Sequence, residues 1–196
     1  MQKKPTKPKT KKKKRRNYRD FMELKIDQKL LKYRQIMLFS EINQQSAKEV
    51  VEKLFVFDQM SDKPITLWIN SGGGSVDDGY AIIDVMRQAR SPIITLIAGS
   101  ACSMAAMISI AGDLRTMTQN STWMAHDIAS FGMGDYITKV ADRTEYLTRE
   151  QTKGEEHLRE YTKLSEKNIE KARHGELWLY PDVCLKKGII DEIIQK

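Results

Sequence analysis

The chain has 196 residues, of which 40% are hydrophobic and 30% charged, and its formal net charge is +7. This length allows one domain with a full core, and no apolar run reaches the roughly 18–20 residues that a membrane-spanning helix needs. Two cysteines, Cys102 and Cys184, exclude a disulfide scaffold, and no Cys/His cluster predicts a metal site. The N-terminus is basic and lacks the apolar core of a signal peptide, so we expect a cytoplasmic protein.

The positive charge is concentrated at the N-terminus. Residues 1–16 contain ten Lys or Arg and no acidic residue, whereas the remaining 180 residues carry 23 basic and 26 acidic side chains, a net charge of −3. Such a charge block is typical of disorder. We therefore expect a disordered basic tail (1–16) and a single domain (17–196). The tail lacks the interleaved aromatic residues of stacking sites, and nucleic-acid binding, if any, is expected only through it.

Strand and helix patterns alternate along the first half of the domain. Residues 17–35 fit a short helix or an extended arm. Residues 93–98 are almost wholly apolar, which is typical of a strand buried on both faces of a parallel sheet, and the apolar run at 104–111 predicts a buried helix. The expected strands are 34–39, 65–70 and 93–98, and the expected helices are 46–58, 77–90 and 104–111.

The second half of the domain has shorter strands and a long charged segment. Residues 129–135 include two glycines and predict a mobile loop, and residues 136–171 predict one long helix or a pair of helices. Short strands are expected at 114–118, at 121–125 and at the end of 185–194, after a turn at Gly188. Because the crossovers are long enough for parallel connections, the fold class is α/β.

Three consecutive glycines, Gly72, Gly73 and Gly74, follow the strand at 65–70. Glycines let a backbone approach a bound chain closely and aim its N–H groups into a site. A flexible turn is the alternative interpretation. A phosphate-binding loop is excluded, because no Gly-Lys-Ser/Thr sequence follows.

Ser103 stands among small residues at the start of the apolar 104–111 helix. The first turn of a helix offers free N–H groups and the positive end of the dipole, which favour the negative charge that develops beside a nucleophile. Two alternatives remain open: Ser103 is a helix cap, or the neighbouring Cys102 is the nucleophile.

His126 ends a short strand and precedes the glycine-bearing loop. A serine nucleophile needs a base, and histidine titrates near neutral pH, so His126 is the candidate base, with a structural role as the alternative. Of the other histidines, His157 lies in a charged helical stretch and is expected to be solvated, and His174 lies in a polar turn.

In combination, these features resemble the ClpP family of self-compartmentalised serine peptidases, from about Leu30 to Ile194. The resemblance implies the ClpP/crotonase-like fold, with repeated strand-strand-helix units and a protruding helix–strand handle. The segments that carry it are Ile69-Asn70-Ser71-Gly72-Gly73-Gly74-Ser75-Val76, Gly99-Ser100-Ala101-Cys102-Ser103-Met104, Asn120-Ser121, Met124-Ala125-His126 and Gly188-Ile189-Ile190-Asp191-Glu192-Ile193.

The resemblance also implies the roles of individual residues. Ser103 becomes the nucleophile and His126 the general base, with the N–H groups of Gly74 and Met104 as the oxyanion hole. Gly72, Gly73 and Ile128 are the expected substrate-binding residues. No metal and no organic cofactor is implied.

The third member of the triad is less well defined. The family has an aspartate two residues before an aromatic residue, and here the matching residue is Glu176, before Trp178. Glu can orient a histidine as Asp does, although its extra methylene group needs a different backbone position. Asp127 and Asp182 are the other acidic candidates.

The family resemblance implies stacked seven-membered rings, fourteen copies in total, that enclose the active sites and act on peptides or unfolded proteins. An AAA+ unfoldase is the implied partner. Three departures bear on this: Gly72 replaces the family's proline, Asp127 and Ile128 replace a Gln-Pro pair, and the basic tail stands where the family has its axial segment.

Three alternatives to an ordinary protease subunit stay open. One is a catalytically silent subunit of the same fold, which the unusual Glu176 favours and the Ser103–His126 pair disfavours. The second is a specialised phage enzyme that matures capsid proteins. The third is an acyl-CoA enzyme of the related crotonase fold, which the order serine, histidine, acid disfavours.

Overall fold

The computed structural model describes residues 25–26, 28–128 and 137–195. The predicted basic tail and the predicted loop at 129–135 lie outside these residues. The chain divides into two units, Met1–Tyr33 and Arg34–Lys196. In the first unit, residues 25–26 and 28–32 are helical, in agreement with the short helix or arm expected for 17–35.

One sheet organises the second unit. Among the described residues its strands are β1 (Gln35–Leu38), β2 (Ile65–Ser71), β3 (Ile93–Cys102), β4 (Leu114–Thr118), β5 (Thr122–His126), β6 (Glu176–Leu179) and β7 (Glu192–Ile194). The strand order is β1-β2-β3-β4-β7, and β5 pairs with both β3 and β6. The β5–β6 pair is antiparallel and the other pairs are parallel.

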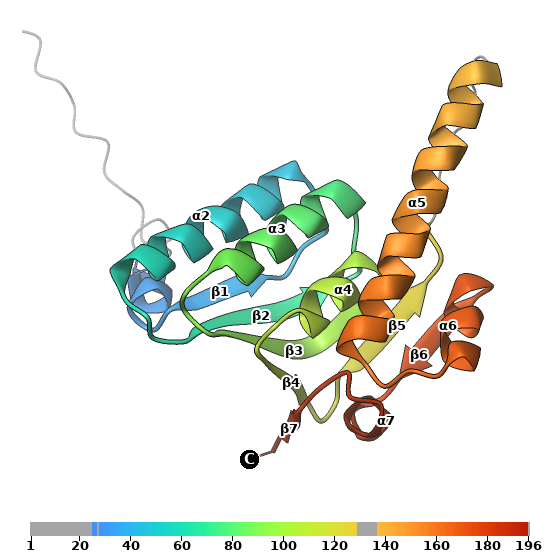
Figure 1. Cartoon of the computed structure of the whole chain (residues 1–196). Coiled ribbons are helices and arrows are strands. Elements are labelled where there is room, and N and C mark those ends of the chain that lie inside the picture. Colours follow the sequence, from blue (N-terminus) through green and yellow to red (C-terminus); the bar gives the residue numbers. More distant parts are fainter. Residues whose placement is uncertain (1–24, 27, 129–136, 196) are drawn as a thin grey trace, which may run out of the picture. The chain divides into compact units, whose positions relative to one another are not determined.

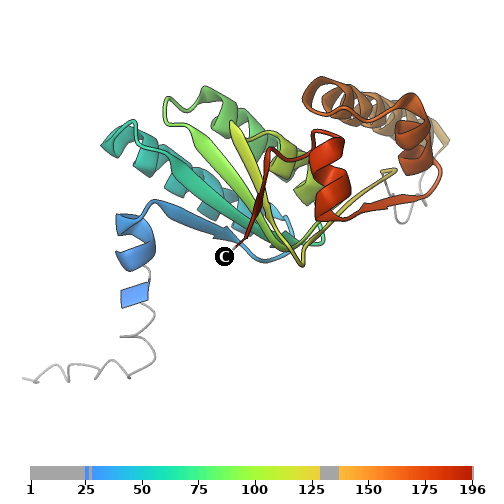
Figure 2. The ribbon, with the colours of Figure 1, turned by 90° about the horizontal axis from the view of Figure 1, so that it is seen from below.

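The helices of the second unit are α2 (Gln44–Met60), α3 (Val76–Gln88), α4 (Met104–Ile110), α5 (Ile137–Tyr161), α6 (Glu166–Arg173) and α7 (Pro181–Lys186). Helices α2 and α3 lie side by side over β1, β2 and β3, and α5 projects beyond the sheet (Figure 1). In the view from below, the strands fan out with a twist, and α7 lies close to β7 (Figure 2).

Burial alternates along the strands because helices α2 and α3 cover one face of the sheet. In β3, Ile93 and Ile97 are buried, whereas Ile94 and Leu96 are only half-buried. The prediction that this strand is buried on both faces is therefore wrong for the chain by itself. The covered face and its helices form the hydrophobic core, which includes Leu54, Phe57, Leu67, Ile69, Ile82, Ile83, Ile97 and Ile108.

Most predicted elements form within two residues of their expected ends. The exception is β3, which continues to Cys102 because its last residues, Ser100 to Cys102, pair with β5. The segment at 136–171 proves to be a pair of helices, α5 and α6. Strand β6 and helix α7 were not predicted.

Arg34 is a buried cation at the C-terminal end of α2. The last carbonyls of a helix lack intrahelical donors and carry the negative end of the dipole, so a cation at this end stabilises the helix. The Arg34 guanidinium donates to the carbonyls of Phe57 (2.6 Å), Ser61 (3.1 Å), Lys63 (2.7 Å) and Pro64 (3.2 Å), and to Ser91 Oγ (2.9 Å). One side chain therefore ties the end of α2 to the segments that enter β2 and β3.

We predict that Arg34→Met lowers the free energy of unfolding by about 3 kcal/mol, because buried carbonyls lose their donor. The measurement is urea unfolding followed by circular dichroism at one fixed protein concentration. Lys48→Met, on the exposed side of α2, is the control and is expected to change stability by no more than about 0.5 kcal/mol. Equal effects of the two substitutions would contradict the role given to Arg34.

Candidate active site

Ser103 occupies the junction between β3 and α4. Its backbone has φ 54° and ψ −126°, a left-handed conformation that is unfavourable for a residue with a side chain. The Ser103 N–H donates to the Met124 carbonyl of β5 at 2.8 Å, which holds this junction in place. Ser103 is the N-cap residue of α4 by position, but among the described residues its side chain makes no capping hydrogen bond.

The Ser103 hydroxyl instead contacts His126. Strands β3 and β5 are paired in parallel with Cys102 opposite Met124, and the next residues along each strand lead to Ser103 and His126. The distance from His126 Nε2 to Ser103 Oγ is 2.9 Å, an ordinary hydrogen-bond length. The structure thus brings the predicted nucleophile and base together.

The glycine turn lies directly beside Ser103. A Cβ added to Gly73, whose φ is +98°, would lie 2.7 Å from both Ser103 Cβ and the Cys102 carbonyl oxygen, so only glycine fits. Ile42 N–H donates to the Gly73 carbonyl and Ser75 N–H donates to the Ile42 carbonyl, each at 2.8 Å. Because an extended backbone alternates its polar groups, the Gly74 N–H faces away from Ile42.

A cavity of about 640 Å³ opens at this point. Every predicted site residue except Glu176 lines it: Gly72, Gly73, Gly74, Ser103, Met104, His126 and Ile128. Met104 is the first residue of α4, and an N–H at that position has no intrahelical acceptor. The cavity therefore combines a serine–histidine pair with the backbone N–H groups of Gly74 and Met104, which have no backbone acceptor among the described residues.

Sequence reasoning missed the wall of the cavity that α5 contributes. Glu150, Gly154 and Leu158 line it, and their spacing of four residues places them on one face of the helix. The spacing of four residues was the sequence signal for this face of the helix, but the many charged residues of the segment obscured it.

The three acidic candidates occupy different places. Glu176 pairs with His126 across the β5–β6 ladder, and its Oε2 accepts from Trp178 Nε1 at 2.7 Å. Within the described residues no hydrogen bond joins Glu176 to His126. Asp127 lines the cavity and accepts from the Ile128 N–H at 2.7 Å, whereas Asp182 lies on α7 in an ion pair with Lys186.

Cys102 is poorly suited to be the nucleophile. Its side chain is buried, with 6% exposed, and burial raises the pKa of its thiol. A thiol with a raised pKa holds little of the reactive thiolate near neutral pH. This leaves Ser103, which is half-buried and lines the cavity described above, as the better candidate at the junction.

Comparison with known proteins places the chain in a family. The Clp protease family model matches residues 19–196. The chain belongs to the Clp protease family.

Two relatives show how far the similarity to this family extends. The ATP-dependent Clp protease proteolytic subunit 2 of Treponema pallidum is 32% identical over 172 residues, 86% of each chain. The ATP-dependent Clp protease proteolytic subunit of Streptococcus sanguinis is 33% identical over 174 residues, 87% of this chain and 89% of the relative.

A solved structure, a mutant of ClpP1 from Listeria monocytogenes, gives a TM-score of 0.78 at 26% identity. It covers 87% of this chain and 96% of that chain. This match confirms the predicted α/β class and the ClpP-like fold. In the described part of this family member, no helix has the length and hydrophobicity needed to cross a bilayer.

A buried carboxylate attaches α6 to α5 in this Clp family chain. Glu155 accepts from Arg173 Nε at 2.6 Å and also from Arg173 Nη2, while Arg159 Nη2 lies 3.4 Å from it. The hydrogen bonds from Arg173 hold the pKa of Glu155 at about 2. Since α6 leads into β6, this ion pair helps to position the strand that carries Glu176.

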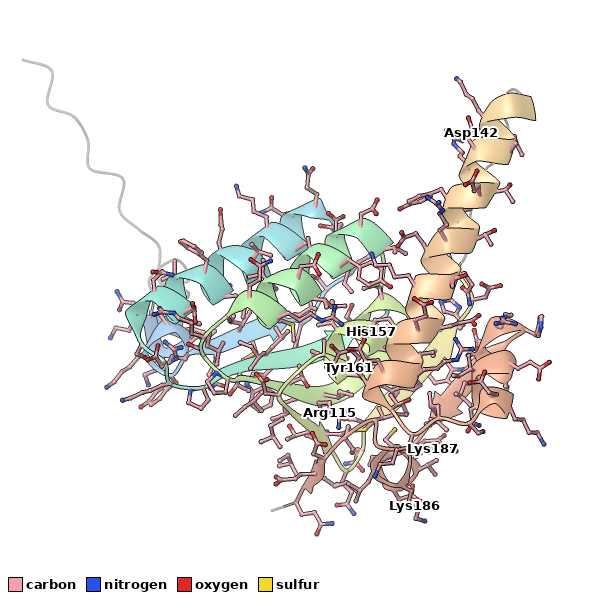
Figure 3. The ribbon with its side chains drawn as sticks, in the orientation of Figure 1. Arg115, Asp142, His157, Tyr161, Lys186 and Lys187 are labelled. Carbon is pink, nitrogen blue, oxygen red and sulfur yellow. The ribbon has the colours of Figure 1, made fainter. Side chains whose placement is uncertain are left out.

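His157 differs from expectation: it is buried, with 4% exposed, so the prediction of a solvated side chain is wrong. Its Nδ1 lies 3.2 Å from Arg87 Nη2 and its Nε2 lies 3.1 Å from the Met107 carbonyl. Because arginine only donates and a carbonyl only accepts, Nδ1 accepts and Nε2 carries the proton. Figure 3 shows His157 and Tyr161 on α5, and their ring centroids lie 4.6 Å apart with the ring planes tilted by 39°.

Burial lowers the pKa of His157, and the Arg87 charge lowers it further, against the hydrogen bond to Met107. The unfolded chain then binds more protons at mildly acidic pH, so this histidine stabilises the fold above its unfolded pKa of about 6.5 and loses that effect as pH falls toward its folded pKa.

We predict that the wild-type chain loses more unfolding free energy between pH 7.5 and 5.5 than the His157→Phe variant does. Urea unfolding at the two pH values measures the difference. His174→Phe, at an exposed position, is the matched control and is expected to keep the wild-type pH dependence. Equal pH dependence in the wild type and His157→Phe would contradict this account.

Proposed function

We propose that the chain is a serine endopeptidase subunit that hydrolyses peptide bonds of unfolded proteins through an acyl-enzyme at Ser103. The observation that carries this proposal is the 2.9 Å contact between Ser103 Oγ and His126 Nε2 at the wall of the cavity. The names of the relatives, which describe proteolytic subunits of an ATP-dependent protease, agree with it.

In the proposed mechanism His126 takes the Ser103 proton as the hydroxyl oxygen attacks a peptide carbonyl carbon. The N–H groups of Gly74 and Met104 stabilise the oxyanion that forms. His126 then gives the proton to the leaving amine, and the same histidine activates the water that hydrolyses the acyl-enzyme.

Gly72 and Gly73 hold the substrate in this proposal. Their backbone follows β2 directly, so an extended peptide can align with it as an added strand. Ile128 lines the same cavity from the residues after β5 and gives the substrate an apolar contact.

We propose Glu176 as the residue that orients His126. Its support is the β5–β6 register, because directly paired residues place their side chains on the same face of a sheet. The hydrogen bond from Trp178 now holds the carboxylate, and a rotation of the Glu176 side chain is required for it to reach His126.

We also infer two stacked rings of seven copies, with an AAA+ unfoldase as the partner and a reducing cytoplasm as the compartment. The support for the rings is the half-covered sheet, since Met37 on β1 and the adjoining Phe39 are exposed. The support for the reducing compartment is that both cysteines are free. The proposed chemistry needs no metal and no organic cofactor. Contact with nucleic acid is proposed only for the tail at 1–16.

A catalytically silent subunit is the second candidate function. The observation that favours it is the Glu176 carboxylate, which is bonded to Trp178 and, among the described residues, not to His126. Labelling of Ser103 separates the two candidates.

We predict that a fluorophosphonate adds one adduct per chain, because His126 activates the Ser103 hydroxyl. Intact-mass spectrometry measures the adduct. Ser103→Ala is expected to show none and to lower peptidase kcat/KM by about 10⁴-fold or more. Folded wild-type protein without an adduct would contradict the protease proposal and favour the silent subunit.

We predict that Glu176→Gln lowers kcat by about 100-fold or more, because the imidazole loses the carboxylate that fixes its orientation and stabilises its protonated form. Asp127→Asn removes the same charge from a neighbouring acid and is expected to change kcat by less than about tenfold. The measurement is the rate of peptide hydrolysis by each variant, compared at equal concentrations of chains that fluorophosphonate labels at Ser103. The reverse order would transfer the role to Asp127.

A further inference from the structure

The cavity beside Ser103 has an apolar lining near the reacting residues. Val76, Met104, Met107, Met124 and Leu158 supply it from α3, α4, β5 and α5. Such a lining accommodates an aliphatic chain of a substrate residue, and by itself it does not distinguish leucine from the stem of lysine.

Glu150 adds a buried charge to the same cavity. Its side chain is 16% exposed, and the oxygen Oε2 is buried without a hydrogen-bond partner in the described part of the chain. A buried carboxylate oxygen without a donor is unfavourable, since such groups in folded proteins are nearly always hydrogen-bonded. Because this oxygen is shielded from solvent, the Glu150 side chain must rotate toward the cavity that it lines before a bound molecule can donate to it.

The neighbouring cation, Lys153, does not fill this role. Its Nζ lies 3.7 Å from Glu150 Oε2, beyond the roughly 2.7–2.9 Å of a charge-assisted hydrogen bond. The same ammonium lies 3.5 Å from the ring centroid of Tyr80, which it contacts as a cation–π pair. The Glu150 oxygen keeps its acceptor capacity.

Two further acidic residues of the cavity lining, Glu41 and Asp127, reinforce the negative potential, whereas the charges of Glu155 and Arg173 offset each other. Of the described Asp, Glu, Lys and Arg residues that line it, Glu41, Asp127, Glu150 and Glu155 are acidic and Arg173 is basic. Arg173 is engaged by Glu155 through two hydrogen bonds. A cationic substrate group therefore enters a favourable field, and an anionic group is repelled.

We propose that Glu150 is a specificity-determining residue that selects lysine or arginine on the acyl side of the scissile bond. The aliphatic stem lies along Val76, Met104 and Leu158, and the cationic head donates to the Glu150 carboxylate once that side chain has rotated toward the cavity. An apolar substrate residue at this position fills the same space but gives the Glu150 carboxylate no donor. The inference rests on the proposed peptidase function, and it names the substrate class of that site.

The test compares two peptides that differ only in the acyl-side residue, lysine or norleucine. Norleucine keeps the aliphatic stem and lacks the ammonium group. We expect wild-type kcat/KM to be at least about tenfold higher for the lysine peptide, the effect of a hydrogen bond between charged groups. A wild-type ratio near one, or in favour of norleucine, would overturn the proposal without the need for any variant.

Glu150→Gln is expected to bring the lysine-to-norleucine ratio close to one while Ser103 still reacts with fluorophosphonate at the wild-type rate. Glu156→Gln removes the same charge from an exposed position of α5 and is expected to keep the wild-type ratio. A Glu150→Gln variant that retains the lysine preference would overturn the role of Glu150.

Fluorophosphonate labelling separates failure of this inference from failure of the proposed function. Labelled wild-type enzyme without a lysine preference would overturn the inference alone. Folded wild-type enzyme that does not label would overturn the peptidase proposal, and the inference with it.

Discussion

The pairing of the end of β3 with β5 is the constraint on which the rest of the site depends. Strand β4 pairs with the first half of β3, and β5 then takes the same edge for the last three residues. The Ser103 N–H bond to Met124 closes this ladder at the point where the chain turns into α4. The strained Ser103 backbone persists because β3 on one side and α4 on the other fix it. The register of β3 and β5 then brings His126 next to Ser103.

Local patterns in the sequence were enough for the parts of the molecule that short segments specify. The strand periods, the glycine run and the small residues before Ser103 are all contiguous signals, and the structure has the corresponding elements. Strand β6 has only four residues, between a charged helix and Pro181, so its pattern was too short to stand out. It exists because it pairs with β5, a contact that no local pattern contains.

Buried polar residues were the other limit of the sequence. His157 and Glu155 lie in a segment so rich in charge that each was indistinguishable from its solvated neighbours. Their burial depends on partners far along the chain, Arg87 and Met107 for the histidine and Arg173 for the glutamate. Such residues can be recognised only once the helices that supply their partners are placed.

Helix α5 meets α3 mainly through directional polar contacts. Tyr146 donates to Asp77 at 2.7 Å, Lys153 lies over Tyr80, and Arg87 contacts both His157 and Tyr161. Hydrogen bonds and cation–π pairs define an angle and a register more sharply than apolar surfaces do. The α5 wall of the cavity is therefore positioned by these directional hydrogen bonds and cation–π pairs as well as by apolar packing.

The bridge between Ile42 and the glycine turn has a consequence for how the site tolerates sequence change. Three successive glycines have large conformational freedom in isolation, yet here Ile42 holds one edge of the turn through both its N–H and its carbonyl, and Ser71 Oγ accepts from the Gly73 N–H at 3.1 Å. A proline would have made the turn rigid from within. Here the rigidity comes from Ile42, in the loop between β1 and α2. The β1–α2 loop, remote in sequence from Ser103 and His126, is thus a place where natural variation can shift the glycine turn while the serine–histidine pair stays the same.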